Sequence, residues 1–382
     1  MSAEPLSPHS FLWVECEGTN RTLDSIAHVD GLLKDARDWG IDTLFVQVYR
    51  GDKAWFESGL CDDSPRAAFR KKEGRDMLAY LLDSAHSQGM QVHAWVNTFR
   101  AGKDPEAGVI RKLGKRVVTR DNNGRSMLDY PGLQLPGADN NYYEADGTGY
   151  WLDPGDTAVQ DYLLAILREL MKKYPTLDGL QLDFIRLPFV VPFSPGARFP
   201  KGITYGYGVR SVERFRAATK SDPLHWDGAT ASAVAWDDWR RDQISSFVVK
   251  VQKEMRRNLP SAKLSAAVVC YGDRAYLSAF QDWRGWLEAG SVDFVTIMNY
   301  SVEEKLCSQV TREALAFSRY RPVWVGLGSY LLAQREKVFE MQLKDGLEQL
   351  REIGKGEIGF FSYDSLKLAP ALVEIIKKRK GK

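Results

Sequence analysis

Residues 178–188 read DGLQLDFIRLP, and this stretch bears on both the fold class and the position of a candidate site. Leu182 and Ile185 belong to an apolar run that predicts a buried strand. Asp183 stands inside that run, although an unpaired carboxylate in a protein core is strongly destabilising. Two explanations are open: a structural Asp183 paired with Arg186, or a catalytic carboxylate at the open end of a strand.

Runs of this kind recur along the whole chain, and each is followed by a segment whose apolar residues have helical spacing. Gly40, Gly89 and Gly290 stand where helices should end before the next strand begins. Strands that alternate with helices predict a parallel sheet, and eight such units predict an α/β protein with a (β/α)8 barrel fold. The predicted strands are 11–18, 43–50, 91–100, 179–188, 263–271, 292–301, 322–330 and 357–366.

Two long segments come after the third and fourth predicted strands, at 101–150 and 189–231. A bare barrel takes about 250 residues, and most of the surplus in this 382-residue chain falls into these two segments. Because both come directly after strands, we expect both on the face where barrel enzymes carry their active sites. With no internal repeat or low-complexity tract, the sequence predicts a single domain over residues 1–382.

Composition narrows the class of protein. The 52 Lys and Arg residues nearly balance the 50 Asp and Glu residues, which argues against bulk nucleic-acid binding. No apolar stretch is long enough to cross a bilayer. The N-terminus, MSAEPLSPHS, lacks the regions of a signal peptide but is similar to the first residues of a chain after signal-peptide cleavage, so exported and cytoplasmic locations both stay open. Cys16, Cys61, Cys270 and Cys307 are far apart, which favours buried thiols over disulfides.

Alternate residues at the strand ends bring carboxylates, amides and aromatic rings to one mouth of the barrel. The predicted catalytic residue is Asp183, with Glu15 as its first partner and Asp364 in reserve. The predicted substrate-binding residues are Glu17, Gln47, Tyr49, Arg50, His93, Trp95, Asn97, Arg100, Gln181, Arg186, Tyr271, Asn299, Tyr300 and Tyr363. Rings stack on sugars, amides bind hydroxyl groups, and two acids serve as general acid and as nucleophile or base. The set therefore predicts a carbohydrate substrate.

Other chemistries find little support in the sequence. It contains no GxSxG motif, and its glycine clusters lack the strand–turn–helix context of a phosphate loop. His93 has no HxH or HExxH motif beside it, so we predict no metal and no cofactor, and expect His93 to form hydrogen bonds in the barrel mouth. A phosphate- or metal-dependent barrel enzyme is the weakest alternative.

Three stretches of the chain resemble glycosyl-hydrolase-like family 10, bacterial barrel proteins that include peptidoglycan glycan hydrolases. They are LLDSAHSQGMQVHAWVNTFRAG from Leu81, YWLDPGDTAVQDYLLAILREL from Tyr150 and LDGLQLDFIRLP from Leu177. DFVTIMNYS and GEIGFFSYDS match more loosely. The resemblance implies a glycoside hydrolase that acts on a bacterial polysaccharide, such as the glycan strands of the cell wall.

Chitinase-like barrels of glycoside hydrolase family 18 provide a contrast, because they carry DGxDxDxE on the fourth strand. The MNY of residues 298–300 fits that family, but Gln181 and Ile185 stand where its motif has the middle Asp and the catalytic Glu. Asp183 is then the only carboxylate within this strand, and a second acid must come from elsewhere. A carbohydrate-binding barrel without a working acid pair is the alternative function.

Three arginines stand at the ends of neighbouring strands. Arg50, Arg100 and Arg186 come at the ends of the second, third and fourth strands and are predicted to ring one side of the mouth. A guanidinium group binds a carboxylate through paired, planar hydrogen bonds. The three arginines therefore predict an acidic sugar, with the lactyl group of muramic acid favoured by the family resemblance and a uronic acid as the alternative.

Overall fold

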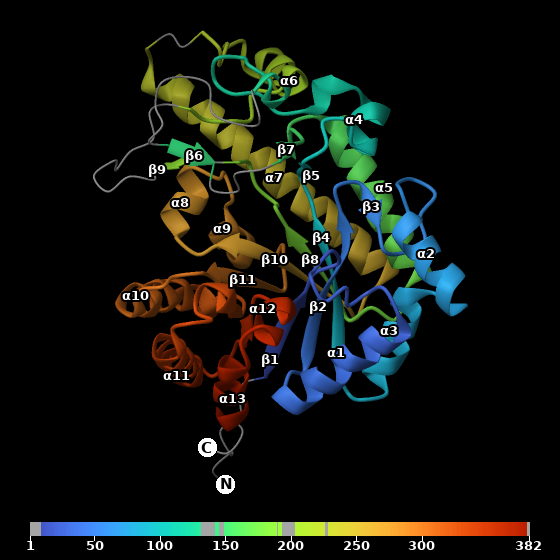
Figure 1. Cartoon of the computed structure of the whole chain (residues 1–382). Helices are drawn as coiled ribbons and strands as arrows, with labels where there is room; N and C mark the ends of the chain where they lie inside the picture. The colour runs from blue at the N-terminus through green and yellow to red at the C-terminus, as the bar shows by residue number, and fades with distance from the viewer. Residues whose placement is uncertain are drawn as a thin grey trace.

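The computed structural model describes residues 9–130, 142–144, 149–188, 190–192, 203–225 and 228–379, with only the backbone described at 142–144 and 190–192. Eight parallel strands form a closed barrel, because β1 pairs with both β2 and β13 (Figure 1). The predicted (β/α)8 fold is confirmed. In their order around the barrel, the strands are β1 (Ser10–Val14), β2 (Thr43–Arg50), β4 (Gln91–Asn97), β8 (Gly179–Asp183), β10 (Lys263–Val269), β11 (Phe294–Asn299), β12 (Val323–Leu327) and β13 (Ile358–Phe360).

Each barrel strand is followed by a helix that covers the outside of the sheet (Figure 1). Gly40 and Gly290 have left-handed backbone, with φ of 75° and 64°, where a helix ends before the next strand, as the sequence predicted. The covering helices are α1 (Ile26–Trp39), α3 (Met77–His86), α5 (Thr157–Lys173), α7 (Thr230–Asn258), α9 (Trp283–Glu288), α10 (Glu304–Leu315), α11 (Glu336–Ile353) and α13 (Pro370–Lys378).

The described parts of the two long segments lie where the sequence predicted them, beyond the C-terminal ends of β4 and β8 (Figure 1). Two short sheets, β5–β7 and β6–β9, organise this end, and Asp121 pairs with Tyr205 across the two segments. Other parts of 101–150 and 189–231 lie outside the described residues. The elements here are β5 (Arg100–Gly102), α4 (Gly108–Leu113), β6 (Tyr142–Glu144), β7 (Tyr150–Trp151), β9 (Val190–Pro192) and α6 (Val209–Thr219).

Shorter elements complete the same end of the barrel. They are β3 (Lys53–Ala54) and α2 (Ser64–Glu73) after β2, α8 (Gly272–Leu277) after β10, and α12 (Tyr363–Lys367) after β13. Several predicted strands end earlier than the apolar runs that defined them. β1 stops at Val14, and β13 stops at Phe360. The residues just beyond these ends form loops and short helices around the mouth.

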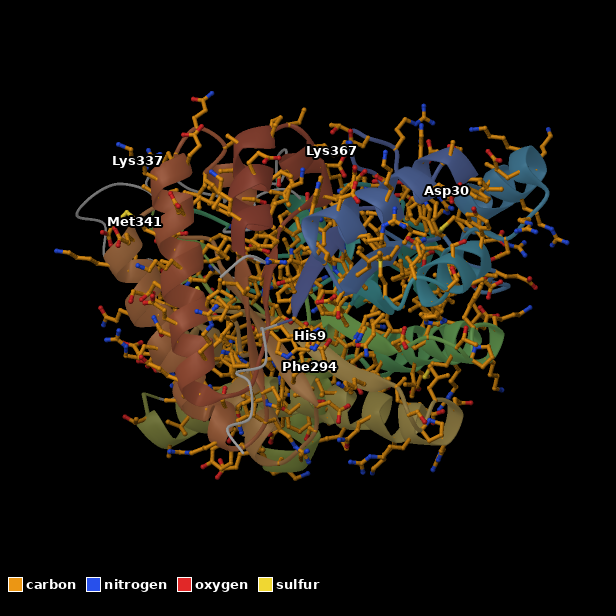
Figure 2. All side chains as sticks on the ribbon, turned by 90° about the horizontal axis from the view of Figure 1, so that it is seen from below. His9, Asp30, Phe294, Lys337, Met341 and Lys367 are labelled. Atoms are coloured by element: carbon orange, nitrogen blue, oxygen red, sulfur yellow. The ribbon has the colours of Figure 1, made fainter. Side chains whose placement is uncertain are left out.

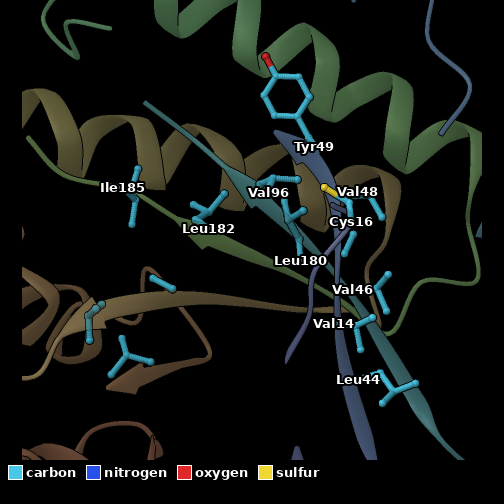
Figure 3. Close-up of a cluster of buried hydrophobic side chains, with 14 of the residues drawn as sticks. Val14, Cys16, Leu44, Val46, Val48, Tyr49, Val96, Leu180, Leu182 and Ile185 are labelled. Atoms are coloured by element: carbon cyan, nitrogen blue, oxygen red, sulfur yellow. The ribbon is translucent and has the colours of Figure 1, made fainter. Parts of the chain in front are cut away.

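Two cores lie on the two sides of the sheet. Leu44, Val46, Leu180 and Leu182 belong to the outer core, between the strands and the covering helices (Figure 3). The inside of the barrel is filled mainly by aromatic rings, and Phe294 lies near the middle of the molecule when it is seen from below (Figure 2). The inner cluster consists of Phe11, Trp13, Phe45, Trp95, Phe294 and Trp324.

Glycines on neighbouring strands make room for these inner rings. A Cβ atom added to Gly326 would lie 2.5 Å from Cη2 of Trp13, and one added to Gly359 would lie 2.3 Å from Cδ2 of Phe11. Such distances are well inside van der Waals contact, so the rings occupy the space that a side chain would otherwise take. Glycine at these two positions therefore leaves room for the rings of Trp13 and Phe11 inside the barrel.

His93 lies inside this aromatic core and not in the mouth. It is fully buried opposite Gly179 at the start of β8, with Phe45 and Phe294 around its ring at centroid distances of 5.2 and 5.9 Å. Both ring nitrogens lack a hydrogen-bond partner among the described residues. The expected hydrogen bonds in the mouth are therefore wrong, because His93 lies near the opposite end of β4. Burial lowers its pKa from 6.5 to about 3, so the ring is neutral.

Gly326→Ala should destabilise the barrel, because the new Cβ must displace the Trp13 ring. We expect a loss of about 1–3 kcal/mol in the free energy of unfolding, measured by urea denaturation. Gly31→Ala in α1 is the control, because a Cβ there meets nothing within 4 Å. That change should stabilise the helix by about 0.5–1 kcal/mol. A Gly326→Ala variant as stable as the wild type would contradict the packing argument.

The buried His93 should make stability depend on pH. Between pH 6.5 and 3 the unfolded chain binds a proton that the folded chain does not, so this residue contributes a loss of stability as pH falls through that window. For His93→Phe, unfolding free energies at pH 7.5 and pH 5 should differ by about 2 kcal/mol less than in the wild type. His28→Gln, at an exposed residue whose ring contacts the backbone carbonyl of Arg21 rather than an acid, is the control and should leave that difference nearly unchanged. An undiminished difference in His93→Phe would refute the buried neutral ring.

Candidate active site

A cleft of about 560 Å³ opens at the C-terminal end of the barrel. Most of the residues predicted for the site line it, together with several that the sequence interpretation missed. Its lining residues are Trp13, Glu15, Gln47, Arg50, Trp95, Asn97, Arg100, Asp183, Phe184, Arg186, Ala267, Val269, Cys270, Tyr271, Arg274, Met298, Tyr300, Tyr330 and Phe361.

Asp183 ends β8 at the base of the cleft and is 6% exposed. Its Oδ2 accepts a hydrogen bond from Nε1 of Trp95 at 3.0 Å, and its Oδ1 accepts one from the backbone N–H of Phe184 at 2.7 Å. Hydrogen bonds to a carboxylate are charge-assisted, so both donors stabilise negative charge on Asp183. Phe184 has a φ of 50°, a backbone conformation that non-glycine residues adopt at a cost and that clusters at functional sites.

Glu15 lies just past the end of β1 on the same cleft. Its Oε2 accepts a hydrogen bond from Oγ of Ser362 at 2.7 Å. Burial raises the pKa of Glu15, and the negative charge of Asp364 raises it further, while the Ser362 hydrogen bond and Arg50 oppose the shift. A carboxyl group with a raised pKa keeps its proton to higher pH, which is what a general acid requires.

Tyr300 lies within electrostatic range of both Asp183 and Glu15. Burial raises its pKa well above the usual value, and the negative charges of Asp183 and Glu15 both add to the shift. Its ring packs against Phe361 at a centroid distance of 5.5 Å and meets Tyr330 nearly at a right angle at 5.8 Å. The phenol is therefore a neutral donor, within the electrostatic range of both acids and inside an aromatic wall.

The floor of the cleft is hydrogen-bonded from below. Nε1 of Trp13 donates to Oε1 of Gln181 at 2.6 Å, and Nε2 of Gln181 donates to Oγ1 of Thr296 at 3.2 Å. Gln181 is fully buried and does not line the cleft, so its predicted contact with substrate is replaced by support of the Trp13 ring. One layer higher, Nε2 of Gln47 donates to Oδ1 of Asn97 at 3.0 Å.

The three predicted arginines line the cleft, and a fourth joins them in Arg274. The Arg186 guanidinium is 5.0 Å from the ring centroid of Phe184, and that of Arg100 is 5.1 Å from the same ring on Phe184. Arg186 also lies 5.0 Å from the ring centroid of Trp151. Cation–π contacts of this kind hold the guanidinium planes in fixed orientations along one side of the cleft.

Tyr49 faces away from the cleft. The pairing of β2 with β4 shifts register between Gln47 and Tyr49, so the alternation of side chains is interrupted there. Figure 3 shows the Tyr49 ring pointing toward α5, and its hydroxyl donates to Oδ1 of Asp52, as does that of Tyr162 from α5. Its predicted contact with substrate is therefore wrong, because the irregularity turns it to the outer core.

Asn299 and Tyr363 also serve packing outside the cleft. Nδ2 of Asn299 donates to the carbonyl of Cys307 and to Oγ1 of Thr311, both in α10, so Met298 and Tyr300 are the residues of this segment that face the cleft. Since β13 ends at Phe360, Tyr363 lies in α12, and its hydroxyl donates to Oδ2 of Asp35. Contrary to the prediction, neither Asn299 nor Tyr363 lines the cleft.

Glu17 and Asp364 lie at the border of the cleft rather than in its lining. Oε2 of Glu17 is 3.5 Å from Nε of Arg50. Oδ1 of Asp364 accepts hydrogen bonds from Oγ1 of Thr19 at 3.0 Å and from the backbone N–H of Asn20 at 2.6 Å. Asp364 therefore holds the loop after β1 and acts on the cleft through the charge that it presents to Glu15.

The sequence interpretation missed several residues of the site. Trp13 could have been found, because it is two residues before Glu15 on the same side of its strand. Phe361 and Ser362 could have been found by ending the last strand earlier. Tyr330 and Arg274 lie in loops and short helices, where no periodicity indicates the direction of a side chain. Among the residues that the structure describes, no group of three His, Cys, Asp or Glu residues could hold a metal ion.

The four cysteines are free thiols, as the sequence predicted. Cys16, Cys270 and Cys307 are buried, and Cys61 is partly buried.

In the part of the chain that the structure describes, no helix combines the length and the apolar character that a transmembrane span needs.

Comparison with known proteins identifies the family and the fold of the chain. The family model described as Glycosyl hydrolase-like 10 matches residues 10–319. Glycosyl hydrolase DigH of Escherichia coli strain K12 is 25% identical over 357 residues, covering 86% of this chain and 70% of that protein. Glycosyl hydrolase YngK of Bacillus subtilis is 21% identical over 289 residues, covering 70% of this chain and 48% of that protein.

Solved structures show the same fold. The PgaB (BpsB) glycoside hydrolase domain from Bordetella bronchiseptica has a TM-score of 0.66 at 14% identity and covers 97% of this chain and 99% of its own. A catalytic mutant of Gan42B, a GH42 beta-galactosidase from G. stearothermophilus, has a TM-score of 0.59 at 12% identity and covers 98% of this chain and 57% of its own. The family match over most of the barrel classes the chain as a glycosidase. The chain belongs to the glycosyl hydrolase-like 10 family, as its sequence motifs predicted.

Proposed function

We propose that this protein hydrolyses O-glycosyl bonds in a bacterial polysaccharide, with Asp183 and Glu15 as the carboxylate pair. The observation that carries the proposal is that both acids line one aromatic cleft and both act on the phenol of Tyr300, whose pKa they raise. Glycoside hydrolysis needs two carboxyl groups in different protonation states on either side of the bond to be broken. Burial and the nearby Asp364 favour the protonated form of Glu15, while Asp183 accepts hydrogen bonds from two N–H groups.

Glu15 has the environment of the general acid. Burial and the nearby Asp364 favour its protonated form, and Ser362 holds its Oε2. Its proton would pass to the glycosidic oxygen as the bond to the leaving sugar breaks. Asp183 accepts two N–H donors, which favour its ionised form and fix its direction. It would act as the nucleophile, or as the base that activates water, on the opposite side of the sugar.

The walls of the cleft suit a sugar ring. Trp13, Tyr300 and Phe361 offer apolar faces, and the paired amides of Gln47 and Asn97 offer donors and acceptors for hydroxyl groups. Aromatic residues with few convergent polar groups are typical of small-molecule sites. These features would also serve a carbohydrate-binding barrel without activity, and the behaviour of the acid variants separates the two functions.

Four arginines on one cleft exceed what a neutral glycan needs. Arg50, Arg100, Arg186 and Arg274 all line it, and stacking on rings orients three of these guanidinium groups. Oriented guanidinium groups bind carboxylates through paired hydrogen bonds. We therefore propose an acidic glycan as substrate, with the lactyl carboxylate of muramic acid in peptidoglycan strands as the preferred group and a uronic acid as the alternative.

Asp183→Asn should lower kcat at least about 10²–10⁴-fold on denuded peptidoglycan, because the ionised carboxylate is lost. Glu15→Gln should lower kcat on the same glycan, yet retain far more activity on an aryl glycoside whose leaving group needs no proton. It should also lose the fall in activity at high pH that reflects deprotonation of Glu15. Products are followed by mass spectrometry. The binding-barrel alternative would hold if the purified wild type bound the glycan and released no product.

Arg100→Ala and Arg50→Ala should each weaken binding of a muramic-acid-containing oligomer by about 2 kcal/mol or more, roughly thirtyfold in Kd. Binding of an uncharged N-acetylglucosamine oligomer of equal length should change much less, because it offers no carboxylate. Arg256→Ala, at an exposed position in the last turn of α7, is the control and should affect neither ligand. Calorimetry in the Asp183→Asn background avoids turnover. Equal affinity of the wild type for both oligomers would count against the acidic glycan.

A further inference from the structure

A second cavity, of about 620 Å³, adjoins the cleft. It lies between the loop after β1 and the helix α2, on the C-terminal side of the barrel. The loop contributes Glu17 and Arg21 to its lining, and α2 contributes Ala68 and Lys72. Trp55, from the turn before α2, forms part of its apolar side. Its volume falls within the range of sites that hold small molecules.

The two cavities share one wall, which consists of two contacting pairs. Cys16 lines the second cavity, and its Sγ donates a hydrogen bond at 3.1 Å to Oε1 of Gln47, which lines the cleft. Glu17 lines the second cavity, and its Oε2 is 3.5 Å from Nε of Arg50, which lines the cleft. The Glu17–Arg50 pair is therefore the boundary that a glycan extending from the cleft past Arg50 would cross to enter the second cavity.

The backbone of the loop after β1 is held in place, whereas the Glu17–Arg50 pair at the rim of the wall is exposed. Asp364 holds the loop through Thr19 and Asn20, and a Cβ added to Gly18 would lie 2.2 Å from Oδ2 of Asp364. The Glu17 and Arg50 side chains on the rim are 46% and 32% exposed. Exposed ion pairs contribute only about 0–1 kcal/mol. Sugar hydroxyl groups can therefore replace this pairing at little cost.

The chemistry of the second cavity suits further sugar units. Trp55 and Phe69 present apolar surface, while Arg21, Lys72 and Glu17 supply both signs of charge at the rim. A pyranose needs an apolar face beneath it and polar groups at its edges. We propose that the second cavity is a distal subsite that binds sugar units of the same glycan beyond those held in the cleft. This inference rests on the proposed function.

Ala68 gives a direct test, because it is exposed on α2 and lines the second cavity, whereas the neighbouring Ala67 is exposed and does not line it. Ala68→Trp should raise KM about tenfold for a decasaccharide from denuded peptidoglycan and leave kcat and the KM of a tetrasaccharide unchanged. Ala67→Trp, which adds the same side chain to the same helix, should change neither. Lys72→Ala should give a smaller effect of the same kind, with Lys71→Ala as its control.

Calorimetric binding of both oligomers, in the Asp183→Asn background, separates this inference from the function on which it rests. Binding of the longer oligomer that Ala68→Trp weakens and Ala67→Trp does not would support the subsite even if no variant hydrolysed any glycan. Two outcomes would overturn the subsite: equal effects of Ala68→Trp on long and short oligomers, and no effect on either. Equal melting temperatures of the two Trp variants would show that the difference does not arise from folding.

Discussion

The inside of a closed eight-stranded barrel must be filled by side chains, and in this protein aromatic rings fill most of it. Phe294 and Trp324 stack at a centroid distance of 3.8 Å deep in the barrel, and Trp13 and Trp95 lie closer to the mouth. The two upper tryptophans also donate hydrogen bonds to β8: the indole N–H of Trp13 reaches Gln181 across the barrel, and that of Trp95 reaches Asp183 on the adjacent strand. The same packing that stabilises the barrel thus orients Asp183 and supports the floor of the cleft.

This arrangement explains how a carboxylate stands inside an apolar strand. Asp183 comes two residues after Gln181 on the inner side of β8, which lifts it from the hydrogen-bonded floor into the cleft. Glu15 stands in the same relation to Trp13 at the end of β1. Each acid therefore sits one layer above an anchored side chain. Arg186 contributes by stacking on rings along the cleft.

Sequence periodicity predicted the barrel strands and the location of Asp183 and Glu15 on the cleft, because period-two alternation holds through most of each strand. It failed where the regular backbone ends or changes. Tyr49 follows a register irregularity and shares Asp52 with Tyr162 of α5, and Tyr363 lies beyond the early end of β13 and bonds Asp35 of α1; no local pattern reveals these long-range contacts. His93 points into the barrel as predicted, but it lies deep in the core instead of at the mouth. Alternation indicates which face of the strand a residue occupies and not how far along the barrel axis it lies.

The glycines inside the barrel have a consequence for how such a sequence can change over time. The space opposite Gly326 belongs to the ring of Trp13, so these two residues are far apart in sequence and share one volume. A larger residue at Gly326 is tolerable only after the Trp13 ring has become smaller, and the reverse order leaves a void. The two positions should covary among homologues, and ancestral changes at one should depend on the history of the other. Gly359 differs, because a Cβ there would also lie 2.3 Å from the backbone oxygen of Phe11, which no side-chain change removes.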